Sequence, residues 1–198
     1  MAKYFGTDGI RGRFGIELNA PLAFKVAQSL KSVLNVDKVV IGIDTRESST
    51  ELMYACASGA QSIGVDVMLA GVVSTPLISH YSKEKQIAGI MITASHNPYK
   101  DNGIKVFNRG NKLTEAQELA VEAFVDGNRD FEVERVGKIY SGEAVIDEYA
   151  TLIDSLDLPY VDLKVGYDSA NGANYMLSKG IFDGLTRDSI QIGNNPDG

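Results

Sequence analysis

Apolar and polar positions alternate along the chain in a pattern that predicts strands and helices in turn. The apolar runs that predict buried strands are 38–43, 65–70, 87–93 and 104–107. The segments with the apolar spacing of a helix are 20–34, 48–63, 76–83 and 114–125. Strands separated by helices predict an α/β fold, a three-layer α-β-α sandwich whose mostly parallel sheet carries helices on both faces.

Local signals predict where two of these helices begin. Ser48 with Glu51, and Thr114 with Gln117, have the spacing of capping boxes, in which the two side chains bond the free N–H groups of the first turn. Gly64 would end the helix that begins at Ser48.

The pattern changes after residue 126. Residues 127–142 are polar and contain scattered glycines, which predicts a connector, and a helix at 143–156, a strand at 163–168, a helix at 175–185 and a strand at 189–193 follow. Two strands are marginal as an independent sheet, and the closing Pro-Asp-Gly is typical of a turn that leads into a further element. We therefore expect two domains, 1–142 and an incomplete 143–198, in a natural protein that continues.

Composition narrows the classes of function. Hydrophobic residues make up 44% of 198 residues, which is enough for a folded core. The formal charge is −7 and the Lys and Arg residues are dispersed, which argues against nucleic acid as a partner. Cys56 is the only cysteine and is expected to be a buried, inert thiol in a reducing cytoplasm. We expect no signal peptide and no membrane partner, because no stretch approaches the ~20 apolar residues of a membrane helix.

The segment 93–105 holds the densest candidate chemistry. It follows a predicted strand, and ligands gather at the carboxyl ends of strands in such folds. Ser95 needs a base, a metal or a positive field to react, and no G-x-S-x-G elbow surrounds it, so a hydrolase triad with His96 is disfavoured. Phosphoryl transfer fits better, with Lys100 and Lys105 as cations, although Ser, Asn and Pro also form ordinary surface turns.

A second polar cluster lies at residues 6–12, where three glycines in seven residues permit close backbone approach to a ligand. Arg11 can pair bidentately with a phosphate. A glycine-rich turn is the alternative interpretation, and the segment is no P-loop because the Gly-Lys-Ser/Thr ending is missing.

Together these segments resemble the α-D-phosphohexomutase superfamily, and within it the bacterial phosphoglucosamine mutases. The segments that carry the resemblance are 4–12, 93–98, 101–105, 168–173 and 195–198, in that order, and the similarity covers the whole chain.

The resemblance implies an isomerase that interconverts glucosamine 6-phosphate and glucosamine 1-phosphate through a bisphosphate. Ser95 would be the phosphoserine that gives its phosphate to the sugar and takes one back, and that phosphate would also bind Mg²⁺. His96, Lys105 and Arg11 would lie in the active site. The residues implied to bind substrate or phosphate are Thr7, Asp8, Arg11, Asn97 and Lys105.

The chain also departs from the family pattern. It lacks the Asp-Gly-Asp-x-Asp-Arg loop that supplies the metal-ligand aspartates, as well as the later sugar-recognition and phosphate-binding loops. We therefore expect no turnover from these 198 residues alone. Ser49 stands where the family usually has glycine. The alternatives are a phosphomannomutase or phosphoglucomutase, a phosphatase, and a non-catalytic module that binds phosphosugars. His80 is expected to be a surface or packing histidine and not a site residue.

Overall fold

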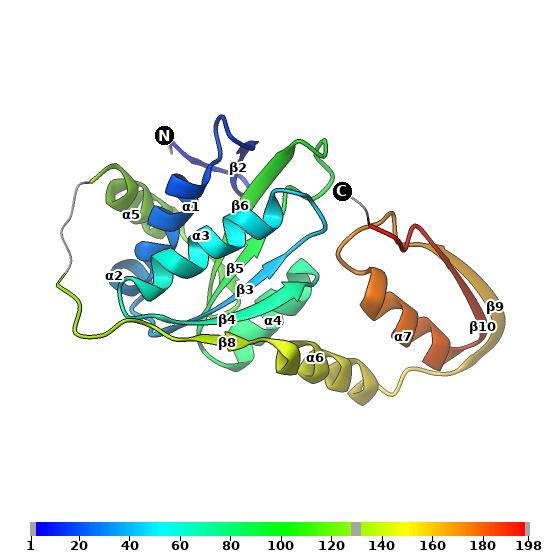
Figure 1. Ribbon diagram of the computed structural model, residues 1–198. Helices are drawn as coiled ribbons and strands as arrows, with labels where there is room; N and C mark the ends of the chain where they lie inside the picture. Colours follow the sequence, from blue (N-terminus) through cyan, green and yellow to red (C-terminus); the bar gives the residue numbers. More distant parts are fainter. Residues whose placement is uncertain (1–2, 128–131, 197–198) are drawn as a thin grey trace.

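The computed structural model describes residues 3–127 and 132–196, and a central eight-stranded sheet dominates it (Figure 1). The strands of this sheet are β1 (Phe5–Gly6), β2 (Gly9–Arg13), β3 (Lys38–Ile43), β4 (Asp66–Val72), β5 (Ala88–Ile92), β6 (Asp101–Asn108), β7 (Asn111–Lys112) and β8 (Ile139–Ser141). Their order across the sheet is β1-β2-β6-β5-β3-β4-β8, with β7 paired to β6.

The sheet is mixed. β3 pairs in parallel with β4 and β5, and β8 pairs in parallel with β4. β6 runs antiparallel to both β5 and β2. The segment that joins β5 to β6 is too short for the crossover of a dozen or more residues that parallel strands need. The predicted parallel pairing is therefore confirmed for β3, β4 and β5 but is wrong for β6.

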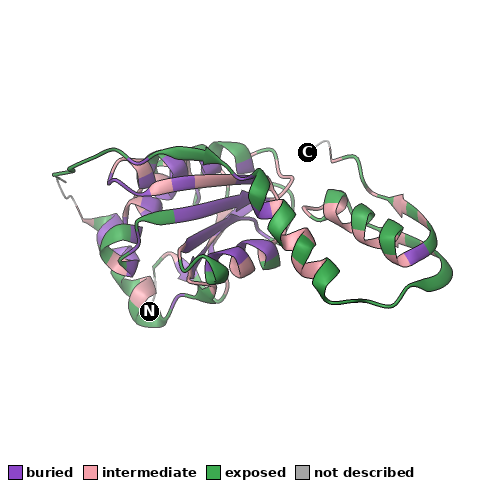
Figure 2. Cartoon of the chain, turned by 90° about the horizontal axis from the view of Figure 1, so that it is seen from below, coloured by how far each residue is buried: buried purple, intermediate pink, exposed green. Residues whose placement is uncertain are grey.

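Helices cover both faces of the sheet, which confirms the three layers (Figures 1 and 2). One face carries α1 (Ala20–Gln28), α2 (Leu30–Leu34), α3 (Ser49–Gln61) and α5 (Glu115–Asp126). The other carries α4 (Thr75–Glu84) and α6 (Glu143–Ser155). Each face has its own core, because alternate residues of a strand point to opposite sides. Val39 and Ile41 of β3 belong to the first core, and Val40 belongs to the second.

The first residues of the helices show which of the predicted capping boxes form. The expected helix 20–34 is broken at Ser29, whose hydroxyl bonds back to the preceding turn. Thr114 and Gln117 form the predicted capping box. The capping box predicted at Ser48 is wrong, because the Ser48 hydroxyl accepts a bond from Asn102 Nδ2 at 2.9 Å and caps no helical N–H.

Three short strands lie where the sequence predicts loops. The glycine-rich segment 6–12 contributes to β1 and β2, and the predicted connector 127–142 contains β8. Strands of two or three residues, such as β1 and β8, are too short to show a period of two, and two of the five residues of β2 are glycines. Gly9 fits here because its φ is +92° and a Cβ would lie 2.5 Å from the carbonyl oxygen of Ile104.

The elements after α6 form a separate βαβ unit. β9 (Val161–Asp168) and β10 (Thr186–Ile192) pair in parallel, and α7 (Tyr175–Leu185) packs on them through Phe182, which stacks on Tyr167 at 4.3 Å between ring centroids. Most of this unit is exposed (Figure 2), including Leu163 and Ile190 at 59% and 66%. α6 itself packs on α4 and buries Val145 in the second core of the large sheet.

Two side chains behave as the sequence predicts. Cys56 is fully buried in α3, and burial raises the pKa of its thiol to about 12, so the thiol is inert at neutral pH. The ring of His80 in α4 packs edge-on against Tyr149 of α6, with 5.9 Å between centroids. Within the described ranges no helix has the length and apolar character needed to cross a membrane.

Candidate functional site

Ser95 lies in the loop that follows β5, with its backbone in a conformation that serine rarely adopts. Its φ is +57°, in the left-handed region. The amide N–H of Ser95 donates to Thr93 Oγ1 at 2.9 Å, and the amide of Asn97 donates to the carbonyl oxygen of Ala94 at 3.1 Å. These bonds present the exposed Ser95 hydroxyl on a tight turn at the carboxyl edge of the sheet.

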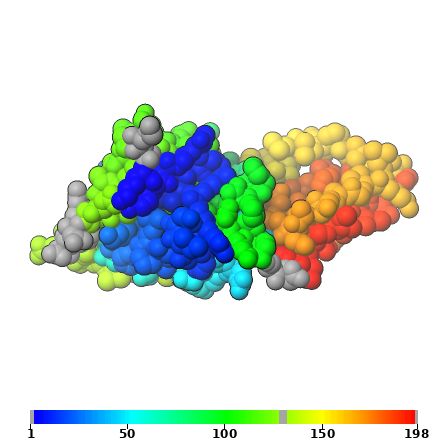
Figure 3. Space-filling model, turned by 90° about the horizontal axis from the view of Figure 1, so that it is seen from above, coloured from blue at the N-terminus to red at the C-terminus, as the bar shows by residue number. Residues whose placement is uncertain are grey.

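The Ser95 side chain lines a hollow of about 600 Å³, which we call the serine hollow. The residues that line it are Asp44, Thr45, Arg46, Thr93, Ser95, His96, Asn97, Tyr99, Ala170, Asn171, Gly172, Ala173 and Pro196. They come from the carboxyl ends of β3, β5, β9 and β10, where ligands bind in such sheets. Thr45 Oγ1 donates to the carbonyl oxygen of Asn171 at 2.7 Å, which joins the two sides. Figure 3 shows the loops of the large sheet beside the C-terminal unit.

His96 lies next to the Ser95 hydroxyl. Its Nδ1 is 3.4 Å from Ser95 Oγ, so these neighbours in sequence also point toward one another. Both side chains are exposed at the serine hollow. An imidazole at this position can exchange a proton with a group that reacts at Ser95.

A cluster of cations surrounds the carboxylate of Asp8. Asp8 Oδ2 lies 2.7 Å from both Arg11 Nη2 and Lys105 Nζ, and Asp8 Oδ1 lies 2.8 Å from Lys112 Nζ. Hydrogen bonds from Lys105 and then Lys112 hold the pKa of Asp8 far below its ordinary value. Asp8 is thus a fixed anion that orients three cations.

The predicted site residues divide between two hollows. Ser95, His96 and Asn97 line the serine hollow, whereas Thr7, Asp8 and Lys105 line a second hollow of about 350 Å³ beside the start of α4. Arg11 connects them, because its Nη2 binds Asp8 and its Nη1 lies 3.4 Å from Asn97 Oδ1.

Lys100, a cation that the sequence suggested, lies apart from the serine hollow. The sequence analysis did not select two other cations, Lys112 and Arg46. Lys100 Nζ lies over the ring of Tyr99, 5.7 Å from its centroid, and does not line the serine hollow. Lys112 binds Asp8, and Arg46 binds the Ser95 loop. The position of Arg46 directly after a strand at the carboxyl edge was a signal that could have identified it.

Comparisons with known proteins agree with this geometry. The family model described as "Phosphoglucomutase/phosphomannomutase, alpha/beta/alpha domain I" matches residues 2–131. The chain belongs to the phosphoglucomutase/phosphomannomutase family.

Relatives of this family match over the whole chain. It is 40% identical to a phosphoglucosamine mutase of Streptococcus gordonii and 38% identical to one of Clostridium novyi, covering 100% of this chain and 46% of each relative. A crystal structure of a phosphoglucomutase/phosphomannomutase family protein from Burkholderia thailandensis superposes with a TM-score of 0.83 at 28% identity, covering 95% of this chain and 43% of that one. The chain thus spans about half the length of the curated relatives it matches.

The described residues do not by themselves form a metal site of the kind expected in this family. In ranges 3–127 and 132–196, no three His, Cys, Asp or Glu side chains are grouped so that they could hold a metal. Asp44 lines the serine hollow, but Arg46 Nε binds its Oδ2 at 3.0 Å and Ser49 Oγ binds its Oδ1 at 2.7 Å. Its carboxylate is therefore already engaged.

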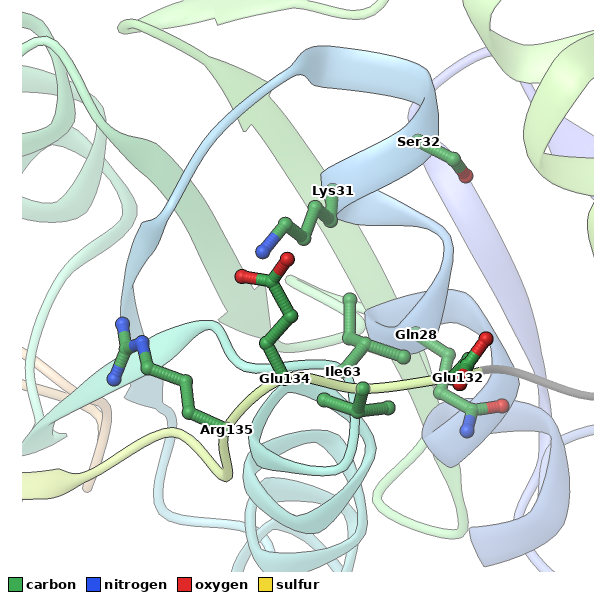
Figure 4. A pocket seen from close by; sticks show the side chains of 8 residues that line it. Gln28, Lys31, Ser32, Ile63, Glu132, Glu134 and Arg135 are labelled. Carbon is green, nitrogen blue, oxygen red and sulfur yellow. The ribbon is translucent and has the colours of Figure 1, made fainter.

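Another hollow, of about 710 Å³, holds none of the predicted site residues (Figure 4). Lys31 and Ser32 of α2 line it opposite the connector that carries Glu132, Glu134 and Arg135. Its lining carries two carboxylates and two cations, Lys31 and Arg135, and contains no residue of the five segments that carry the family resemblance. The serine hollow is therefore the better candidate for the family's phosphate chemistry.

Proposed function

We propose that this chain carries the phosphoserine of a phosphoglucosamine mutase, an enzyme that interconverts glucosamine 6-phosphate and glucosamine 1-phosphate. The observation that carries the proposal is the Ser95 hydroxyl, held on a left-handed turn at the mouth of a 600 Å³ hollow. The name of the similar proteins supports glucosamine as the sugar. By the full-length enzyme we mean this chain extended to the length of those relatives.

The proposed reaction at Ser95 is a reversible phosphoryl transfer. The bond between phosphorus and Ser95 Oγ breaks, a bond forms between phosphorus and a sugar hydroxyl oxygen, and that hydroxyl loses its proton. The resulting bisphosphate then returns its other phosphoryl group to Ser95 Oγ, and the second sugar phosphate leaves. His96 Nδ1, 3.4 Å from Ser95 Oγ, is placed to carry the proton.

The cation cluster supports a charge-stabilising role for Lys105. Its ammonium lies 2.7 Å from the Asp8 carboxylate, and the side chain is 14% exposed. A charged ammonium can stabilise the oxygens of a transferring phosphoryl group but cannot accept a proton. Charge stabilisation is thus better supported for Lys105 than a role as general acid or base. Arg11 extends the same positive field toward Asn97 in the Ser95 loop.

Mg²⁺ is part of the proposal for the full-length enzyme, with the phosphate on Ser95 as one ligand. The described carboxylates form no group that would complete its coordination. The proposal also includes a cytoplasmic location, a sugar phosphate as the ligand, and a division into a phosphoserine domain and a partial second domain. The proposed division is 1–142 and 143–198, and α6, which begins the second part, packs on α4 of the first.

Three rivals make different predictions for the same assay. A phosphomannomutase or phosphoglucomutase would turn over mannose or glucose phosphates faster than glucosamine phosphates. A non-catalytic module would bind sugar phosphates without interconverting them, and a phosphatase would release inorganic phosphate.

The test is a turnover assay of the full-length enzyme with each of the three hexose phosphates and Mg²⁺. We expect turnover to be fastest with glucosamine phosphate and to be abolished by Ser95→Ala, because no other group can carry the phosphate. The matched control is Ser155→Ala, which removes an exposed hydroxyl of α6. Binding of glucosamine 6-phosphate with no turnover would support the non-catalytic module instead.

A further inference from the structure

We propose that Arg46 is the positioning residue of the Ser95 loop, and that it sets the direction in which Ser95 Oγ points. This inference rests on the proposed function for its consequence in catalysis, but its structural part stands on contacts alone. Arg46 follows β3, its side chain is 10% exposed, and it lies between β3 and the loop that joins β5 to β6.

The Arg46 guanidinium donates to four carbonyl oxygens of one loop. Nη1 donates to Pro98 at 2.7 Å and to Asp101 at 2.9 Å. Nη2 donates to Ser95 and to Asn97, both at 2.9 Å. The rigid fork of a guanidinium fixes the relative positions of the groups that it binds. The four carbonyls span the segment from the reacting serine to the start of β6.

The remaining N–H of the guanidinium is also used. Nε donates to Asp44 Oδ2 at 3.0 Å, so five bonds occupy every N–H that a guanidinium has. The Asp44 carboxylate also balances the charge of Arg46. Arg46 therefore has no donor left for a substrate phosphate, and its contribution is to hold the loop.

The Asp44 carboxylate, which binds Arg46, is itself held by a hydrogen bond from Ser49. Ser49 Oγ donates to Asp44 Oδ1 at 2.7 Å and accepts from Asn102 Nδ2 at 3.0 Å. Ser49 and Asn102 are both fully buried. Asn102 lies in β6, so the network runs from α3 through β6 and Asp44 to the Ser95 loop. Ser49, the departure from the usual glycine, is a member of this network.

The Ser95 loop needs contacts that hold it in place, because the backbone of Ser95 is in a disfavoured conformation. A non-glycine residue at φ +57° persists only where its surroundings determine it. The loop's own bonds, from the amides of Ser95, Asn97 and Asp101, close two short turns but do not attach the loop to β3. The Arg46 side chain makes that attachment.

The structural test is hydrogen exchange of the Ser95, Asn97 and Asp101 amides in the 198-residue chain and its Arg46→Lys variant. Lysine keeps the charge but cannot reach four carbonyls at once, so we expect these amides to exchange about tenfold faster while β3 and β5 are unchanged. Arg135→Lys is the matched control, because Arg135 pairs with Asp66 at 2.8 Å, away from the serine hollow.

Unchanged exchange in the loop, or an equal increase throughout the sheet, would overturn the proposal. If Arg46→Lys fails to fold, Ser49→Ala serves as the milder variant. It leaves the guanidinium in place and loosens Asp44, so a smaller but loop-confined increase is expected. A uniform increase in that variant would contradict the network.

The catalytic consequence is read in the full-length enzyme. We expect Arg46→Lys to lower kcat about 100-fold with little change in KM, because the Ser95 phosphate would be misplaced while the sugar contacts stay. A rise in KM alone would show that Arg46 binds substrate instead. If the unmodified enzyme has no mutase turnover, the proposed function fails, while the exchange result still decides the role of Arg46 in the loop.

Discussion

Lys105 Nζ and Asp8 Oδ2 lie 2.7 Å apart, although the two residues are far apart in the sequence. β2 and β6 pair antiparallel, which brings Asp8, just before β2, beside Lys105 in β6. Lys105 is only 14% exposed, so its ammonium is held in one place. A cation fixed in this way needs no reorganisation when charge develops nearby.

Replacing Lys105 tests this role. We expect Lys105→Ala in the full-length enzyme to lower kcat by about 100-fold or more, because one oriented donor is lost. The unfolding midpoint should change little by comparison. Steady-state kinetics and a urea titration measure the two effects. Loss of stability with normal kcat would make Lys105 a structural residue.

Asp8→Asn tests the carboxylate that gathers the cations. The folded pKa of Asp8 lies below its unfolded value, so Asp8 contributes stability above the unfolded pKa and loses it as pH falls through the folded pKa. With a side chain 32% exposed, the contribution is about 1 kcal/mol at neutral pH.

The expected result is that Asp8→Asn is less stable than the parent at pH 7 and that the difference shrinks as the pH falls below about 4. Urea unfolding across that pH range measures it. A stability difference that grows on acidification would show that the sign of the linkage is wrong.

Ser49→Ala tests the network behind Arg46. The substitution removes the bond from Ser49 Oγ to Asp44 and leaves Asn102 Nδ2 with only Ser48. We expect a loss of about 1–2 kcal/mol in the free energy of unfolding, because a buried charged group loses a donor. Ser155→Ala, at an exposed position, should stay within about 0.5 kcal/mol of the parent. Equal effects of the two variants would rule out a special role for Ser49.

Two glycines give a matched test of packing. A Cβ on Gly59 of α3 would lie 2.1 Å from the carbonyl oxygen of Phe24 in α1, whereas a Cβ on Gly180 of α7 would meet nothing within 4 Å. We expect Gly59→Ala to destabilise the protein by about 1–3 kcal/mol through the forced separation of the helices. Gly180→Ala should instead stabilise α7 by about 0.5–1 kcal/mol. Urea unfolding and amide exchange in α7 measure these changes.

Much of the fold follows from local sequence signals. The strand Lys38–Ile43 and the helix Tyr175–Leu185 were predicted with the bounds that the structure has, because each shows a strong period between clear breaks. The antiparallel direction of β6 and the presence of the short strand β8 were not predicted, since both depend on pairing with strands distant in sequence. The capping box at Ser48 was wrong because the hydroxyl binds Asn102 from another element.

The candidate site, too, could be predicted only where the signal is local in the sequence. Ser95 and His96 could be selected from one polar loop, and Arg11 and Lys105 from the chemistry of phosphate binding. The role of Asp8 could not be predicted, because it depends on ion pairs with Lys105 and Lys112, which are distant in sequence and meet Asp8 only in the folded protein. Arg46 was missed because its acceptors are backbone carbonyls and Asp44, so only its position after a strand at the carboxyl edge could have identified it.

The most direct test of the account is peptide-mapping mass spectrometry of the full-length enzyme after incubation with glucosamine 1,6-bisphosphate and Mg²⁺. We predict the mass of one phosphoryl group on the peptide that contains Ser95, and no such mass in the Ser95→Ala variant, which should also show no turnover. Full mutase turnover by an enzyme whose Ser95 never carries phosphate would contradict the account.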